Sequence, residues 1–90
     1  MSTLSDVTEF RVNVWLTCEL HGTTAEFEEK FSRRFRELGD TIRFEEGYTI
    51  EEAKRVLLNF SPNMKLGPKA EAEFQALREW VYSLAPFNTA

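Results

Sequence analysis

The sequence predicts a small α+β domain, or a small α/β domain, whose elements follow the order β-α-β-α-α. Three observations lead to this prediction. Residues 10–20 alternate between apolar and polar side chains, residues 41–46 repeat that alternation over a shorter length, and three other segments space their apolar residues three or four positions apart. A period of two is typical of a half-buried strand, and a period near 3.6 of an amphipathic helix. We therefore expect a two- or three-stranded sheet packed with three helices.

The chain of 90 residues is expected to form a single compact domain over 1–90, with flexible ends at 1–8 and 86–90. Its apolar fraction of 42% is ordinary for a globular protein and too high for a disordered one. A domain of this size buries only about 60–65% of the surface of its unfolded chain, so each apolar stripe is needed for the core.

The first predicted strand runs over residues 10–20. Its inner side takes the apolar positions, which are Phe10, Val12, Val14, Leu16, Cys18 and Leu20. Its outer side takes the polar positions and one large aromatic residue, which are Arg11, Asn13, Trp15, Thr17 and Glu19. This pattern is typical of a strand with one face on a core and one in water.

A helix is predicted over 24–38, because Thr23 and Glu26 have the spacing of a capping box and Gly39 suits the C-terminal cap. The predicted apolar face of this helix consists of Phe27, Phe31, Phe35 and Leu38. The second strand is predicted over 41–46, where Ile42 and Phe44 alternate with polar residues.

Two more helices follow. Thr49 and Glu52 repeat the capping-box spacing and open a helix that ends before Ser61-Pro62. The apolar residues expected to be buried by that helix are Ala53, Val56, Leu57 and Phe60. Pro68 suits the first position of the last helix, which Pro86 stops. The apolar face of the last helix is formed by Ala70, Phe74, Leu77, Val81 and Leu84.

A two-stranded sheet is rarely stable alone, and its edges must be paired or covered. The sequence leaves open three ways of pairing or covering these edges. They are a further strand from the N-terminal residues, cover from the connection at 61–67, and edge pairing with a second copy that completes the sheet by dimerisation. The connection contains Met64 and Leu66, so we expect it to pack against the body of the domain. A homo-oligomer is one of the expected partners.

The net charge of −4 argues against binding to nucleic-acid backbones or to anionic membranes, which need a basic surface. No apolar run reaches the roughly 18 to 20 residues that cross a bilayer, and Met1 to Thr8 lacks the features of a secretory signal. The single cysteine cannot form an internal disulfide, in agreement with a reducing compartment. These observations predict a cytoplasmic protein.

No set of residues in the sequence has the spacing of a known catalytic or cofactor motif. Cys18 and His21 are a thiol and an imidazole close in sequence, but the predicted strand turns Cys18 into the core and His21 away from it. The acidic residues around Gly47 match no calcium loop and are expected to form a solvated corner. We therefore expect a protein that is not an enzyme and that holds no cofactor or metal.

Two functions are compatible with this sequence. The first is a small interaction protein, which is an adaptor, a regulator or an inhibitor. It binds another protein through the exposed face or edge of the sheet and through a basic patch on the helix predicted over 24–38, formed by Lys30, Arg33 and Arg34. Tryptophan and arginine often dominate protein interfaces, and the expected partner-binding residues are Arg11, Asn13, Trp15 and Thr17. The second is a homo-oligomer that binds a small anionic ligand or a nucleotide between subunits. Its expected anion-binding residues are Lys30, Arg33, Arg34, Lys65 and Lys69.

Overall fold

The computed structural model describes residues 1–59 and 64–88, without the side chains of residues 53 and 56–59. In these residues the secondary structure consists of four helices, which are α1 (Leu4–His21), α2 (Ala25–Glu46), α3 (Ile50–Asn59) and α4 (Pro68–Tyr82). The described chain contains no sheet, and its only extended pairing is one antiparallel bridge between Thr3 and Lys65. The predicted α+β or small α/β class, the β-α-β-α-α order and the two- or three-stranded sheet are therefore wrong.

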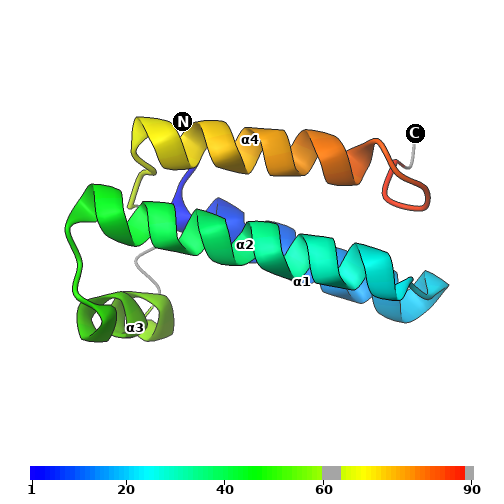
Figure 1. Cartoon of the computed structure of the whole chain (residues 1–90), viewed down its shortest axis with the longest axis horizontal. Helices are drawn as coiled ribbons and strands as arrows, with labels where there is room; N and C mark the ends of the chain where they lie inside the picture. Colours follow the sequence, from blue (N-terminus) through cyan, green and yellow to red (C-terminus); the bar gives the residue numbers. More distant parts are fainter. Residues whose placement is uncertain (60–63, 89–90) are drawn as a thin grey trace.

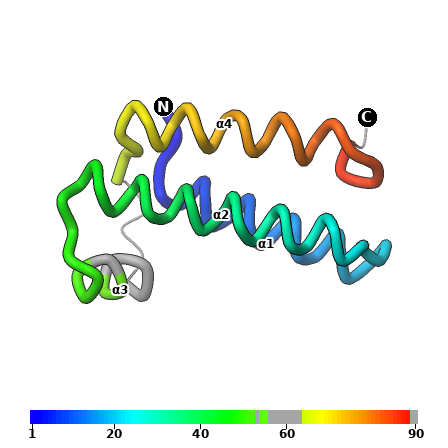
Figure 2. The backbone as a smooth tube through the Cα atoms, viewed as in Figure 1, coloured from blue at the N-terminus to red at the C-terminus, as the bar shows by residue number. Residues whose placement is uncertain are grey.

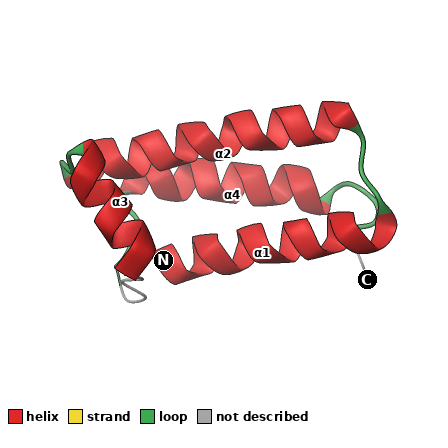
Figure 3. Cartoon of the chain, turned by 90° about the horizontal axis from the view of Figure 1, so that it is seen from below, coloured by secondary structure: helices red, strands yellow, loops and turns green. Residues whose placement is uncertain are grey.

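Helices α1, α2 and α4 lie side by side along the long axis of the molecule (Figures 1 and 3). The chain runs in one direction along α1, returns along α2 and runs in the first direction again along α4 (Figure 2). The short α3 lies in the connection between α2 and α4 and crosses one end of the three long helices. The architecture is thus an up-down-up bundle of three helices with a fourth, shorter helix at one end.

The segment predicted as the first strand, residues 10–20, belongs to α1. The buried residues of this helix begin before that segment and are spaced by three, three and four positions, as Leu4, Val7, Phe10 and Val14. Thr3 caps the helix: its hydroxyl accepts the Asp6 N–H at 3.3 Å, and the Asp6 carboxylate accepts the Thr3 N–H at 2.8 Å. This reciprocal pair is a capping box that specifies a helix start at the fourth residue.

The alternation that suggested a strand arises because α1 has apolar residues on two sides. Phe10, Val14 and Cys18 face the core, with a spacing of four. Val12, Leu16 and Leu20 have the same spacing but are exposed. Two stripes offset by two residues reproduce a period of two, so the pattern did not distinguish a strand from a helix with two apolar faces.

The second predicted strand, at 41–46, is wrong because α2 continues to Glu46. Ile42 lies four positions after Leu38 and extends the same apolar stripe, and both pack in or against the core. The left-handed C-terminal cap is Gly47, at φ 71°, and not Gly39, which lies inside the helix. The N-cap is Thr24, one residue later than predicted, and its hydroxyl accepts the Phe27 N–H at 3.1 Å.

The predicted face of α2 is confirmed: Leu38 is buried in the core, while Phe27, Phe31 and Phe35 pack against it. The predicted start of α4 at Pro68 is also confirmed. Four of the five residues assigned to its apolar face are buried, namely Ala70, Phe74, Leu77 and Val81. The helix ends at Tyr82, so the half-buried Leu84 and Pro86 lie beyond it.

Thr49 stands before α3 as predicted, and its hydroxyl accepts the Glu52 N–H at 3.1 Å. The predicted burial of Ala53, Val56, Leu57 and Phe60 lies outside the described residues. The connection into α4 packs against the body over its described part, as expected, because Leu66 is buried. Its backbone N–H donates to the Ser2 carbonyl at 3.0 Å.

The two chain ends, which we expected to be flexible at 1–8 and 86–90, make contacts with the bundle in the described residues. Ser2, Leu4 and Val7 are buried. The Leu4 N–H donates to the Met64 carbonyl at 2.8 Å, which ties the beginning of α1 to the connection before α4. At the other end, the Phe87 ring stacks on Phe27 with centroids 5.1 Å apart.

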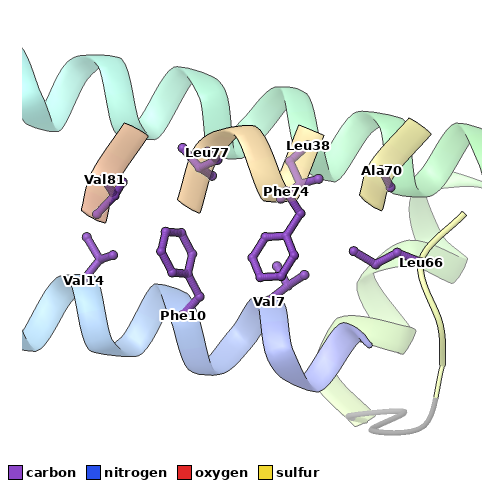
Figure 4. Close-up of a cluster of buried hydrophobic side chains, with 9 residues drawn as sticks. All are labelled: Val7, Phe10, Val14, Leu38, Leu66, Ala70, Phe74, Leu77 and Val81. Carbon is purple, nitrogen blue, oxygen red and sulfur yellow. The ribbon is translucent and has the colours of Figure 1, made fainter. Parts of the chain in front are cut away.

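The core lies between the three long helices, with one row of side chains from each of α1 and α4 facing the other (Figure 4). Its buried residues are Val7, Phe10, Val14, Leu38, Leu66, Ala70, Phe74, Leu77 and Val81. Phe10 joins all three long helices, because its ring lies 6.0 Å from Phe31 of α2, and 5.6 and 5.7 Å from Phe74 and Tyr82 of α4. Aromatic contacts in this range stabilise beyond their buried area.

Candidate protein-binding face

The side of α1 that points away from the core carries four exposed apolar residues, which we call the outer face of α1: Val12, Trp15, Leu16 and Leu20. Their exposed fractions are 46%, 61%, 47% and 80%. On a helix, residues three and four positions apart are neighbours, so these side chains form one stripe. Isolated exposed apolar residues are normal on a protein surface, but a contiguous stripe that includes a tryptophan is a typical interaction site.

A groove of about 580 Å³ lies next to this stripe, between α1 and α2. Its lining from α1 is Thr8, Arg11, Val12, Val14, Trp15 and Cys18, and its lining from α2 is Phe27, Glu28, Phe31 and Ser32. Val14 is buried, and Cys18, Phe27 and Phe31 are half-buried residues that pack against the core. The exposed residues Trp15 and Glu28 thus border a hollow whose other lining is largely apolar.

The four predicted partner-binding residues do not share one face, because the helix divides them into two pairs. Arg11 and Trp15, four positions apart, both line the groove, and the Arg11 guanidinium lies 5.4 Å from the centre of the Phe35 ring. Asn13 instead lines a hollow between α1 and α4. The Thr17 hydroxyl donates to the Asn13 carbonyl at 2.8 Å, as is common for threonine inside a helix.

Trp15 is exposed, whereas the sequence left open whether another element covers it, and the residues beside it were assigned to the wrong side. The predicted strand turned Val12, Leu16 and Leu20 inward, whereas α1 turns them outward. The proposed sheet face and sheet edge therefore do not exist in the described residues. The spacing of four from position 12 to 20, offset from the stripe that begins at Leu4, was the signal that could have identified this face.

The predicted anion-binding residues are distributed over both ends of the bundle. Lys30 and Arg34 lie over the Trp80 ring, with the Lys30 Nζ and the Arg34 Cζ at 4.7 and 5.2 Å from its centre. Phe27 stacks on the same indole at 5.4 Å. These contacts make Trp80 a packing residue. Cations over an indole face are attracted by its quadrupole, so the two cations stabilise the pairing of α2 with α4.

The other three residues of that set do not join this pair. Arg33 is exposed on α2, next to Arg34 in sequence. Lys65 precedes α4 and forms the bridge with Thr3. Lys69 is in the first turn of α4, where its N–H donates to the Glu45 carboxylate at 3.1 Å. Since Arg34 and Glu45 are eleven residues apart on α2, about 16 Å separates the two groups along the helix.

Cys18 packs against the core as predicted, whereas His21 is exposed in the last turn of α1. No group of three metal-ligating side chains gathers anywhere in the residues that the structure describes. Within that same part of the chain, no helix combines the length and the apolar content that a bilayer crossing requires.

Glu45, two residues before Gly47 in the predicted acidic corner, has a definite role. The carboxylate of Glu45 accepts the backbone N–H groups at the start of α4, and a negative charge at a helix N-terminus is favourable.

The outer face of α1 and its groove therefore remain the candidate site. Comparison of the chain with protein-family models, with curated proteins and with solved structures found no match.

Proposed function

We propose that the chain is a non-enzymatic interaction protein of the cytoplasm that binds a helical segment of a partner protein on the outer face of α1 and in the adjoining groove. The observation that supports this proposal most is Trp15, which is 61% exposed in the middle of an apolar stripe and at the edge of an apolar groove. Large aromatic side chains in such positions often carry much of the binding energy of an interface.

A helix is the partner segment that suits this site. An extended peptide binds by adding a strand to a sheet edge, and the described residues contain no sheet. A groove between two neighbouring helices accepts the ridge of a third helix, with axes about 8–10 Å apart. A partner helix here would contact both α1 and α2 and would bury the stripe.

The second function expected from the sequence, binding of an anionic ligand, draws less support from the geometry. The basic residues assigned to it lie at two ends of the bundle, and two of them are in contact with the Trp80 ring. We therefore propose protein binding.

The test is capture of proteins from an extract of the native host by three immobilised chains: the wild type, Leu16→Glu and Phe44→Glu. Leu16→Glu places a charge in the middle of the outer face of α1. Phe44→Glu is a matched control, because Phe44 is an apolar residue of α2 that is 81% exposed and lines a hollow formed by α2 and α4, without residues of α1. We expect partners that the wild type and the control retain and Leu16→Glu loses. If Leu16→Glu retains the same proteins as the wild type, the proposal is wrong.

A further inference from the structure

We infer that, in the free protein, the outer face of α1 is covered by the same face of a second copy of this chain, with the two α1 helices antiparallel about a two-fold axis at Leu16. This inference rests on the proposed function, because it names the occupant of that site in the absence of another partner. Such a dimer would regulate the site, since another partner must displace the second copy.

The first argument is the symmetry of the stripe. Val12 and Leu20 lie four residues before and four residues after Leu16, and all three are exposed on one side of α1. A two-fold axis perpendicular to the helix at Leu16 places Leu16 against itself and Val12 of each copy against Leu20 of the other. A two-fold interface requires a surface that is complementary to itself in this way.

The second argument is charge. In this register, position i of one copy lies level with position 32 − i of the other. The two α1 helices overlap in this register over residues 11–21, because α1 ends at His21. Glu19 is the only carboxylate in that overlap, and it lies level with Asn13. The pairing therefore avoids a like-charge contact between carboxylates, which would oppose association.

The third argument is area. The four side chains together expose roughly 300 Å² of apolar surface, if a whole tryptophan contributes about 200 Å² and a whole aliphatic side chain about 100 Å². A two-fold contact therefore buries roughly 600 Å² from these side chains alone, about half of the 1,200 Å² at which specific interfaces begin. The polar neighbours on α1 and the lining of the groove are available for the rest. A total at or below about 1,200 Å² is the range of weak, transient associations, so we expect a dimer that dissociates readily.

The mass of the wild-type chain, measured by size-exclusion chromatography with light scattering from micromolar to millimolar concentration, is the first test. We expect the mass to rise to that of two chains, and Leu16→Glu to weaken the dimer more than about 100-fold, because each charge is buried opposite its copy. Phe44→Glu should associate as the wild type does. A wild-type mass of one chain at every concentration would overturn the inference.

Disulfide formation tests the geometry. Because Cys18 is the only cysteine, Cys18→Ser provides a background in which one new thiol reports one position. Leu16→Cys should cross-link with itself on oxidation, whereas Phe44→Cys should not. Val12→Cys should cross-link with Leu20→Cys of a second chain in preference to itself. Cross-linking of Val12→Cys only with itself would show a parallel pair and would contradict the antiparallel arrangement.

The inference and the proposed function can fail separately. If the chain is monomeric while host proteins are lost only with Leu16→Glu, the second copy is not the occupant, but the proposed site stands. If neither self-association nor capture depends on Leu16, both are wrong.

Discussion

The carboxylate of Glu45, near the end of α2, accepts the backbone N–H of Ala70 in the first turn of α4 at 2.6 Å. It also accepts the N–H of Lys69 at 3.1 Å. The N-cap residue Gly67 has no side chain that could accept these donors, so Glu45 takes the role that serine or aspartate has at other helix starts. The contact fixes the beginning of α4 on the end of α2, although the partners are 24 and 25 positions apart in sequence.

Glu45→Ala should lower the free energy of unfolding by about 1–2 kcal/mol, because it leaves two N–H donors of α4 without their acceptor and removes a negative charge from the helix N-terminus. Urea denaturation followed by circular dichroism measures this change. Glu46→Ala, one residue further on an exposed position, is the control and should change stability by less than about 0.5 kcal/mol. Equal losses in both variants would show that the cap contributes nothing.

Gly67→Ala should destabilise the wild type but not a chain that already carries Glu45→Ala. A Cβ at Gly67 would lie 2.7 Å from the Glu45 carboxylate, so one of the two must move, while the backbone at φ −69° tolerates alanine. Removal of Glu45 removes the clash. A double-mutant cycle measured by urea denaturation should give a coupling of about 0.5–2 kcal/mol between the two sites. Additive effects would contradict the close approach.

Gly39→Ala should raise the free energy of unfolding by about 0.5–1 kcal/mol. Gly39 lies inside α2, and a Cβ there meets no atom within 4 Å, so alanine gains helix propensity without a steric cost. The midpoint of thermal unfolding measures the gain. Gly47→Ala is the contrasting variant and should destabilise, because Gly47 adopts a φ of 71°. A loss of stability in Gly39→Ala would mean that α2 does not continue through this position.

The stability that Glu71 contributes should depend on pH. Burial raises the pKa of the Glu71 carboxyl, but hydrogen bonds from the Ser2 N–H, the Ser2 hydroxyl and Gln75, together with the N-terminal ammonium, outweigh burial and hold the pKa below its ordinary value. A carboxyl with a lowered pKa in the folded state stabilises the fold above its unfolded pKa, about 4.3 for glutamate. That contribution is lost as the pH falls below this value towards the folded pKa.

Wild type and Glu71→Gln should therefore differ in the free energy of unfolding at pH 7, and the difference should shrink as the pH falls from about 5 to about 3. Chemical denaturation at several pH values measures it. Glu79→Gln, on an exposed position of α4, is the control for removal of a negative charge from the same helix. A difference between wild type and Glu71→Gln that stays constant across this range would contradict the role of the Ser2 contacts.

The sequence predicted the helices whose apolar residues follow a single stripe. In α4, Ala70, Phe74, Leu77 and Val81 leave the opposite side polar, so only a helix buries them together. The second strand was wrong because Gly39 was taken as a helix end, although Ile42 continues the stripe beyond it. A glycine in a helix costs about 1 kcal/mol relative to alanine, and packing of the residues around it outweighs that cost.

In α1 the sequence pattern was ambiguous, because a core stripe and an exposed stripe together imitate the alternation of a strand. The Thr3–Asp6 capping box is the feature that distinguishes the two structures. The same ambiguity explains why the candidate site was predicted only in part. Arg11 and Trp15 were placed on the side of the segment away from the core, although exposure of Trp15 was left open, whereas Leu16 and Leu20 required the helical period before they could be placed on the surface.

The two tryptophans have different surroundings, so the fluorescence of each one reports a different event in the protein. Trp80 is stacked on Phe27 and covered by two cations, so its fluorescence responds to separation of α2 from α4. Trp15 projects into water beside the groove, so its fluorescence responds to whatever covers that groove. With Trp80→Phe or Trp15→Phe, unfolding and occupancy become separate signals that can be followed without any attached dye.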